Sequence, residues 1–140
     1  EYQKMLYQNN LNTAVMDYLL ANSTFKDLPK EVTDYQVNQC LNYYYTMAQY
    51  YGYDLDSFLQ AAAGYNSADD LLDAMSDSIT EYAREALLYQ AVAEAMDIAP
   101  TQEQIDTYSA YTETYGANYC TMVALMDAVS EALTTGAQVK

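Results

Sequence analysis

One segment in the first half of the chain carries its own start and stop signals for a long helix. Pro29 stands where a helix would begin, Glu31 falls in the first turn, and Gly52 follows the last turn. Proline is favoured at the start because its missing N–H would have no partner there, and glycine is favoured just past the end. Apolar residues recur between these signals at spacings of three and four, namely Val37, Leu41, Tyr44, Ala48 and Tyr51. The pattern predicts an amphipathic helix that packs one face against a partner.

The rest of the chain offers few positions at which a helix must stop. It has two prolines and four glycines, and alternating strand patterns bounded by turn clusters are hard to find. Hydrophobic residues make up 51% of the chain, which is enough material for a core. We therefore predict an all-α fold of about six helices. They are expected at residues 2–20, 29–51, 54–63, 67–97, 101–115 and from there to about 133.

Local signals support several of these boundaries. Asp54 is a good N-cap and Gly64 a good stop for the third helix. Thr101 and Gln104 match a capping box for the fifth helix, which Gly116 ends. The fourth helix has an unbroken apolar stripe from residue 72 to residue 96, which would need a long partner helix. The last helix is expected to place its apolar residues on one face, namely Met122, Met126, Val129 and Leu133.

The charge balance restricts the possible partners. With 20 acidic and five basic residues, the net charge is −15. Phosphate neutralisation needs clustered Lys and Arg, so we expect no nucleic acid partner, and an anionic membrane surface is disfavoured for the same reason. No apolar run approaches the ~18 residues of a spanning helix, so membrane insertion is not expected. The acidity itself favours solubility or, alternatively, the attraction of basic, unfolded segments.

The residue types that usually carry catalysis are scarce. Histidine, the commonest general base and metal ligand, is absent. Cys40 and Cys120 lack Cys-x-x-Cys spacing and are expected to be buried free thiols, although a disulfide between them remains open. Asp54 and Asp56 lack the remaining ligands of a calcium loop. The carboxylates of Asp69, Asp70, Asp73 and Asp77 are expected to be solvated and to complement a helix dipole. We predict no catalytic residue, no metal site and no cofactor.

Aromatic residues are the one feature that points to binding. The chain has 17 tyrosines, two phenylalanines and no tryptophan. A helix cannot turn all the aromatic residues around the end of the second predicted helix inward, so some must be exposed or meet another element. Exposed aromatic patches commonly mark interaction sites. We predict that a polypeptide substrate binds at Tyr43, Tyr44, Tyr45, Met47, Tyr50, Tyr51 and Tyr53. In an alternative interpretation, these faces pair with a second copy, as a homodimer, or with another domain.

The order of motifs resembles the C-terminal chaperone domain of the trigger factor family. The resemblance begins in the first helix and passes through Leu28-Pro29-Lys-Glu and Gly52-Tyr-Asp54. It continues through the helix that runs from Ala83-Arg-Glu-Ala-Leu to Met-Asp-Ile98, and through the acidic helix start Thr101-Gln-Glu103. The resemblance implies an elongated all-α domain over residues 1–140, with arm-like helical projections that hold unfolded or nascent polypeptide.

The same resemblance bears on the parent protein. Because the chain opens on Glu1, we expect it to be a fragment of a longer protein. The resemblance implies that this parent is a peptidyl-prolyl cis-trans isomerase through a domain absent here, and that this chain is not itself an enzyme. It also implies a cytoplasmic location. The alternative is a secreted or envelope-anchored protein, because the chain is unusually acidic and rich in tyrosine.

Overall fold

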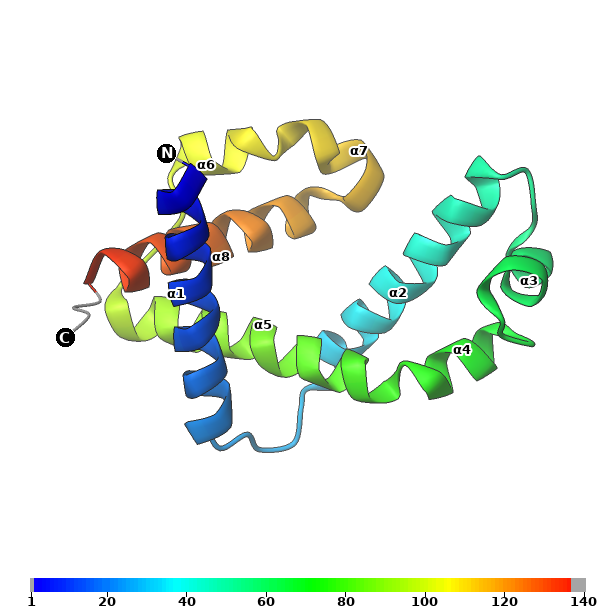
Figure 1. Cartoon of the computed structure of the whole chain (residues 1–140), viewed down its shortest axis with the longest axis horizontal. Helices are drawn as coiled ribbons and strands as arrows, with labels where there is room; N and C mark the ends of the chain where they lie inside the picture. The colour runs from blue at the N-terminus through cyan, green and yellow to red at the C-terminus, as the bar shows by residue number, and fades with distance from the viewer. Residues whose placement is uncertain (1, 137–140) are drawn as a thin grey trace. The chain divides into compact units, whose positions relative to one another are not determined.

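Helices are the dominant secondary structure of the chain. A computed structural model describes residues 2–136, and within them no strand is present (Figure 1). The α-helices are α1 (Tyr2–Asn22), α2 (Lys30–Tyr50), α3 (Leu55–Phe58), α4 (Ala68–Ala74), α5 (Ser76–Met96), α6 (Gln102–Thr107), α7 (Thr112–Tyr115) and α8 (Ala117–Gly136). A π-helix (Leu59–Ala63) follows α3, and a 3-10 helix (Ser109–Tyr111) precedes α7. The all-α prediction is confirmed.

The expected count of about six helices is close, and two interruptions raise it to eight over residues 2–136. The predicted fourth helix bends at Met75, where φ is −94° and ψ is 2°. The residues after this bend are Ser76, Asp77 and Ser78, which compete with the helix for backbone hydrogen bonds. The predicted fifth helix is interrupted at Tyr108, whose carbonyl accepts the N–H of Tyr111 in a 3-10 turn.

The chain divides into two compact units. Unit 1 combines residues 1–24 with residues 86–140, and unit 2 is the continuous stretch 25–85. The boundary falls inside α5, so the long apolar stripe of this helix is shared between two cores. Within the described residues, no single helix packs along its whole length. The expectation of a long partner helix is therefore wrong, because the stripe up to Glu85 belongs to unit 2 and the stripe from Ala86 onward belongs to unit 1.

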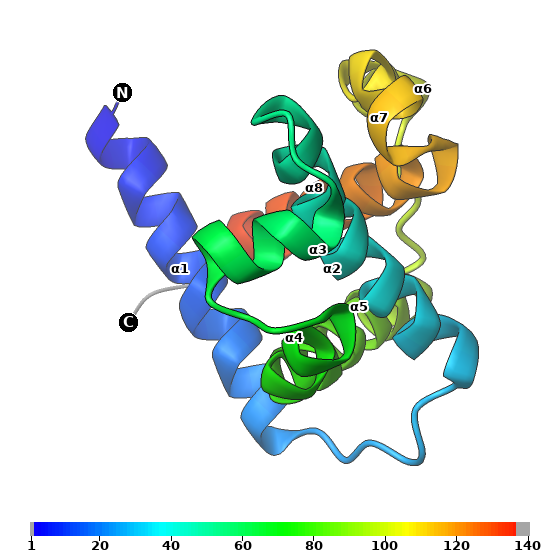
Figure 2. The same ribbon diagram turned by 90° about the vertical axis from the view of Figure 1, so that its right-hand side faces the viewer.

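Unit 1 is organised around α8. Helix α1 crosses α8, and α6 and α7 pack along it (Figures 1 and 2). The most buried positions of α8 are the small residues Cys120, Ala124 and Ala128 together with Val129. Small side chains at a spacing of four let a neighbouring helix approach closely. The predicted apolar face is therefore only partly correct, since Met122, Met126 and Leu133 are half-buried and lie to its side.

Unit 2 is built around α2, which packs on α3 and α4. The predicted start and stop signals of the third helix, Asp54 and Gly64, are confirmed. The Asp54 carboxylate accepts the Ser57 N–H at 2.9 Å and caps α3, and Gly64 ends the π-helix with φ 81°. The centre of this unit holds Leu59 and Leu71, which are fully buried.

Two further properties of the described residues follow. Both cysteines are free thiols, with Cys40 half-buried and Cys120 buried. The thiol of Cys120 donates to the carbonyl of Tyr108 at 3.2 Å. Among residues 2–136, no helix combines the length and the apolar character needed to cross a membrane.

Candidate functional site

The predicted binding residues lie at the C-terminal half of α2 and in the turn that follows it. Five of the seven are exposed, with Tyr50 the most open at 80%. The other four exposed residues are Tyr43, Tyr45, Tyr51 and Tyr53. Tyr44 and Met47 are half-buried. The structure thus agrees with the expectation that one helix cannot bury all of them.

Helix geometry separates one of the seven from the others. Tyr43, Met47 and Tyr50 follow one another at spacings of four and three, so they share one side of α2. Tyr45 lies about 200° around the helix from Tyr43, since each residue advances about 100°. Its hydroxyl accepts a hydrogen bond from the side-chain amide of Gln49 at 2.9 Å. The structure therefore does not bring Tyr45 together with the exposed row.

Ring contacts join Tyr43 and Tyr50 of this exposed row to the tyrosines that follow them in the sequence. Tyr43 and Tyr44 meet edge to face with centroids 5.3 Å apart, and Tyr50 and Tyr51 do so at 5.1 Å. Aromatic pairs in this geometry stabilise one another beyond their buried area. We call the set Tyr43, Tyr44, Met47, Tyr50 and Tyr51 the aromatic surface of unit 2. Tyr53 adjoins it beyond Gly52, and no ring contact joins it to that surface within the described residues.

Two supporting residues were missed by the sequence reasoning. Tyr65 meets Tyr44 at 6.1 Å, edge to face, and the buried Phe58 stacks on Tyr51 at 6.0 Å with an interplanar angle of 9°. Both lie outside α2, and no pattern in the sequence shows how a later segment folds back onto it. Burial, with a smaller contribution from Tyr65, raises the pKa of Tyr44, so its hydroxyl stays neutral at physiological pH. The aromatic surface contains no Asp, Glu, Lys, Arg or His residue.

The surroundings of the aromatic surface are acidic. Unit 2 contains eleven carboxylates, from Asp27, Glu31, Asp34, Asp54, Asp56, Asp69, Asp70, Asp73, Asp77, Glu81 and Glu85. Its only basic residues are Lys26, Lys30 and Arg84. Lys30 is paired with Asp34, and the guanidinium of Arg84 lies 5.8 Å from the ring centroid of Phe25. Negative potential therefore dominates this unit.

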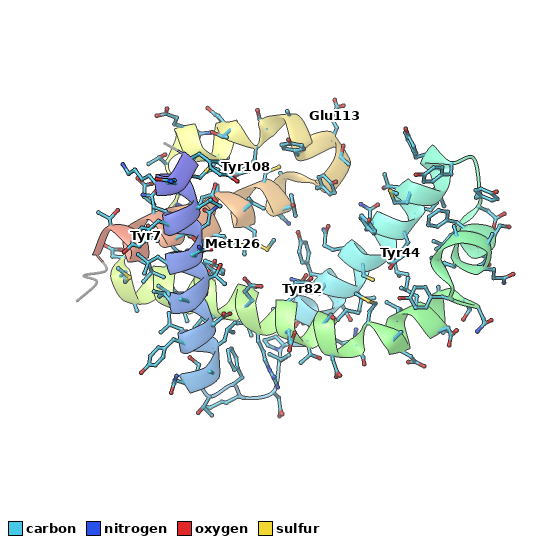
Figure 3. All side chains as sticks on the ribbon, in the orientation of Figure 1. Tyr7, Tyr44, Tyr82, Tyr108, Glu113 and Met126 are labelled. Atoms are coloured by element: carbon cyan, nitrogen blue, oxygen red, sulfur yellow. The ribbon has the colours of Figure 1, made fainter. Side chains whose placement is uncertain are left out.

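A second apolar feature is a groove in unit 1 between α5 and α8. Its volume is about 280 Å³. Ala86, Tyr89 and Gln90 of α5 line one side. Helix α8 supplies the other side, with Asn118, Thr121, Met122, Leu125 and Met126. The Met126 side chain projects from the α8 ribbon (Figure 3). Helical spacing correctly predicted that Met122 and Met126 share one face of α8. It does not show whether that face is covered by another helix or lines an open groove.

The carboxylates at the starts of α4 and α5 lie open to solvent. Asp69, Asp70, Asp73 and Asp77 are all exposed, as expected. The backbone N–H and side-chain amide of Asn66 donate to Asp70, and these hydrogen bonds lower the pKa of that carboxyl. Within residues 2–136, no group of His, Cys, Asp or Glu is arranged to hold a metal ion.

The match to a known family decides the relationship. The family model described as "Bacterial trigger factor protein (TF) C-terminus" matches residues 1–134. The chain belongs to the trigger factor C-terminus family. This confirms the resemblance drawn from the order of motifs, and places the chain in a family of chaperone type.

The matched family model corresponds to the chaperone part of trigger factor, which is distinct from its prolyl isomerase domain. No curated protein and no solved structure matches the chain.

Proposed function

We propose that this chain is a polypeptide-binding chaperone module without catalysis of its own. The observation that carries the proposal is the aromatic surface of unit 2, where Tyr43, Tyr50 and Tyr51 are exposed by 58 to 80%. Tyrosine side chains offer large apolar area with few rotatable bonds, and their hydroxyl groups tolerate contact with water. Such a surface suits weak contact with apolar segments of an unfolded or nascent chain.

The acidic surroundings complement this surface. Eleven carboxylates against three basic residues give unit 2 a strongly negative field. Such a field keeps the module soluble with a client attached, and it attracts segments that carry Lys or Arg beside their apolar residues. The field is screened within ~10 Å at 0.1 M salt, so this contribution weakens as salt is added.

A double substitution with a matched control tests the proposal. Tyr43→Ser with Tyr50→Ser removes two exposed rings from the aromatic surface. Tyr45→Ser with Tyr82→Ser removes two rings that are also exposed, helical and in unit 2, but do not belong to that surface. Tyr82 is labelled in Figure 3 on α5, a different helix from the one that carries Tyr44. We expect the first variant to need roughly tenfold more protein to suppress aggregation of a chemically unfolded client, since each ~1.4 kcal/mol of lost contact is a factor of ten. The control should behave as the original chain.

Equal suppression by both double variants, with helicity intact by circular dichroism, would contradict the assignment of the aromatic surface. Sedimentation separates the alternative. A tight homodimer that hides hydrophobic-dye binding, and that dissociates in the Tyr43→Ser, Tyr50→Ser variant, would instead make the aromatic surface an assembly interface.

The proposal extends to the whole domain and to the protein of which it is a part. We propose that both units act as one module over residues 1–140, with helical projections that hold the client. We also propose a parent protein with a separate prolyl isomerase domain and a cytoplasmic location. The alternative is a secreted or envelope-anchored parent.

A further inference from the structure

We infer that the groove between α5 and α8 is a second binding site, which takes one bulky aromatic side chain of a polypeptide. This inference rests on the proposed polypeptide binding. The groove is separate from the aromatic surface of unit 2, because all of its lining residues belong to unit 1. It also differs in shape, because the groove is a concave site with a limited volume.

The size of the groove fits a single ring. A cavity of about 150 Å³ lined by aliphatic and aromatic side chains accepts benzene. The groove measures about 280 Å³. It therefore has room for the ring of a Phe, Tyr or Trp side chain and for the carbon that joins it to its backbone.

A buried tyrosine lines one side of the groove, and flexible methionine side chains line the other. The ring of Tyr89 is only 5% exposed, and its hydroxyl lies 3.5 Å from the hydroxyl oxygen of Ser130. Across the groove, Met122 and Met126 are half-buried and stand one turn apart on α8. Methionine is flexible, and its sulfur makes favourable contacts with aromatic rings. An aromatic guest would thus meet a fixed face on one side and thioethers on the other.

Polar groups at the groove point to a peptide as the carrier of that ring. Gln90 and Asn118 are exposed, and each carries an amide. The Gln90 amide nitrogen donates to the Glu94 carboxylate at 2.8 Å, so the Gln90 amide oxygen can accept from a peptide N–H. Within the described part of the chain, the Asn118 side chain has no hydrogen-bond partner. A few polar groups around an apolar site commonly fix the orientation of a ligand. Peptide N–H and C=O groups flanking an inserted ring would suit these amides.

The lack of basic residues around the groove disfavours negatively charged ligands. The lining contains no charged residue. Residues 86–136 contain no Lys or Arg, and their carboxylates come from Glu94, Asp97, Glu103, Asp106, Glu113, Asp127 and Glu131. A fatty acid, a nucleotide or an acidic peptide would find no cation here and would be repelled. The groove therefore fits a neutral aromatic residue whose neighbours are not acidic.

Methyl NMR of the methionines tests this inference directly. The chain has seven methionines, so Met122 and Met126 report on the groove, and Met5, Met47 and Met75 report on other places. The probes are the blocked peptide Gly-Ser-Trp-Ser-Gly and its counterpart with Ala in place of Trp. We expect the Trp peptide to shift the Met122 and Met126 signals saturably, and the Ala peptide to leave them unmoved.

Two groove variants provide the matched perturbations. Ala86→Leu fills the groove from α5, and Met126→Gln makes its other wall polar. We expect each to weaken peptide binding about tenfold, or about 1.4 kcal/mol. The variant Tyr18→Ser should bind the peptide unchanged, because Tyr18 is exposed on α1 and belongs neither to the groove nor to the aromatic surface of unit 2. Equal shifts with both peptides, equal shifts of all methionines, or no shift at all would overturn the inference.

The two proposals fail in different ways. Suppression of client aggregation without any peptide-induced shift at Met122 and Met126 would overturn the groove site alone. A saturable shift at these methionines, with no suppression by the original chain, would overturn the chaperone function and leave the groove as a binding site of another role.

Discussion

The hydroxyl of Tyr108 provides a sharp test of how unit 1 is held together. Tyr108 follows α6, and its hydroxyl donates a hydrogen bond to the carboxylate of Asp127 on α8. The substitution Tyr108→Phe removes this hydrogen bond and keeps the ring. It therefore isolates one polar contact between two packed helices without leaving a cavity.

The expected loss of stability follows from the exposure of the pair. A hydrogen bond to a charged group contributes about 1.5–3 kcal/mol when it is well shielded. Tyr108 is half-buried and Asp127 is exposed, so water competes for the carboxylate. We therefore expect Tyr108→Phe to lower the free energy of unfolding by about 1 kcal/mol. Tyr111→Phe is the matched control, because its hydroxyl makes no hydrogen bond within the described residues.

The same contact should be visible in an alkaline titration. The hydrogen bond to Asp127, followed by burial and the negative charge of that residue, raises the pKa of Tyr108 to about 12. A raised pKa means that the folded state favours the neutral hydroxyl. Its contribution to stability is complete below pH ~10, the usual tyrosine value, and is lost as the pH rises to about 12.

Urea unfolding at pH 7 and tyrosinate absorbance together measure both effects. The original chain should show a late-titrating tyrosine that disappears in Tyr108→Phe and shifts to lower pH in Asp127→Asn. The reasoning is refuted if Tyr108→Phe is as stable as the Tyr111→Phe control and loses a tyrosine that titrates with the majority.

Three further predictions concern the backbone, the core and the thiols. Gly116 has φ 87° and ψ 157°, a region open essentially only to glycine, so Gly116→Ala should destabilise unit 1 by about 1–3 kcal/mol in urea unfolding although no atom obstructs its Cβ. Leu71 is fully buried in unit 2, so Leu71→Ala should cost about 2–5 kcal/mol, measured by the same method. A thiol reagent should modify Cys40 before Cys120, which is 2% exposed, yet more slowly than free cysteine, because burial raises the pKa of the Cys40 thiol.

Helix boundaries were the most predictable part of this fold. Pro29, Asp54, Gly64, Thr101 and Gly116 each act through their own backbone or side chain, so their effect can be read without knowing the tertiary structure. The capping box is a clear case. The Thr101 hydroxyl accepts the Gln104 N–H at 3.2 Å, and the Gln104 side chain accepts the Thr101 N–H at 2.9 Å.

Features that depend on distant residues were not predictable. The apolar stripe of the predicted fourth helix has the same spacing on both sides of Met75, so it reveals neither the bend nor the change of core within α5. The exposure of tyrosines around the end of α2 was predictable, because the six tyrosines and Met47 of this segment cannot share one face. Their supports Phe58 and Tyr65 were not, because their register against α2 is set by tertiary packing.

The division of the chain has a consequence for its folding during synthesis. Unit 2 is one continuous stretch, and its contacts can form as soon as residues 25–85 have left the ribosome. Unit 1 cannot be completed then, because α1 packs on α8 and nearly a hundred residues separate the two helices. Such distant contacts form slowly, because the entropy of closing a long loop is lost before the contacts contribute stabilising free energy. We therefore expect α1 to remain without its partner until α8 has been synthesised, while unit 2 is already folded.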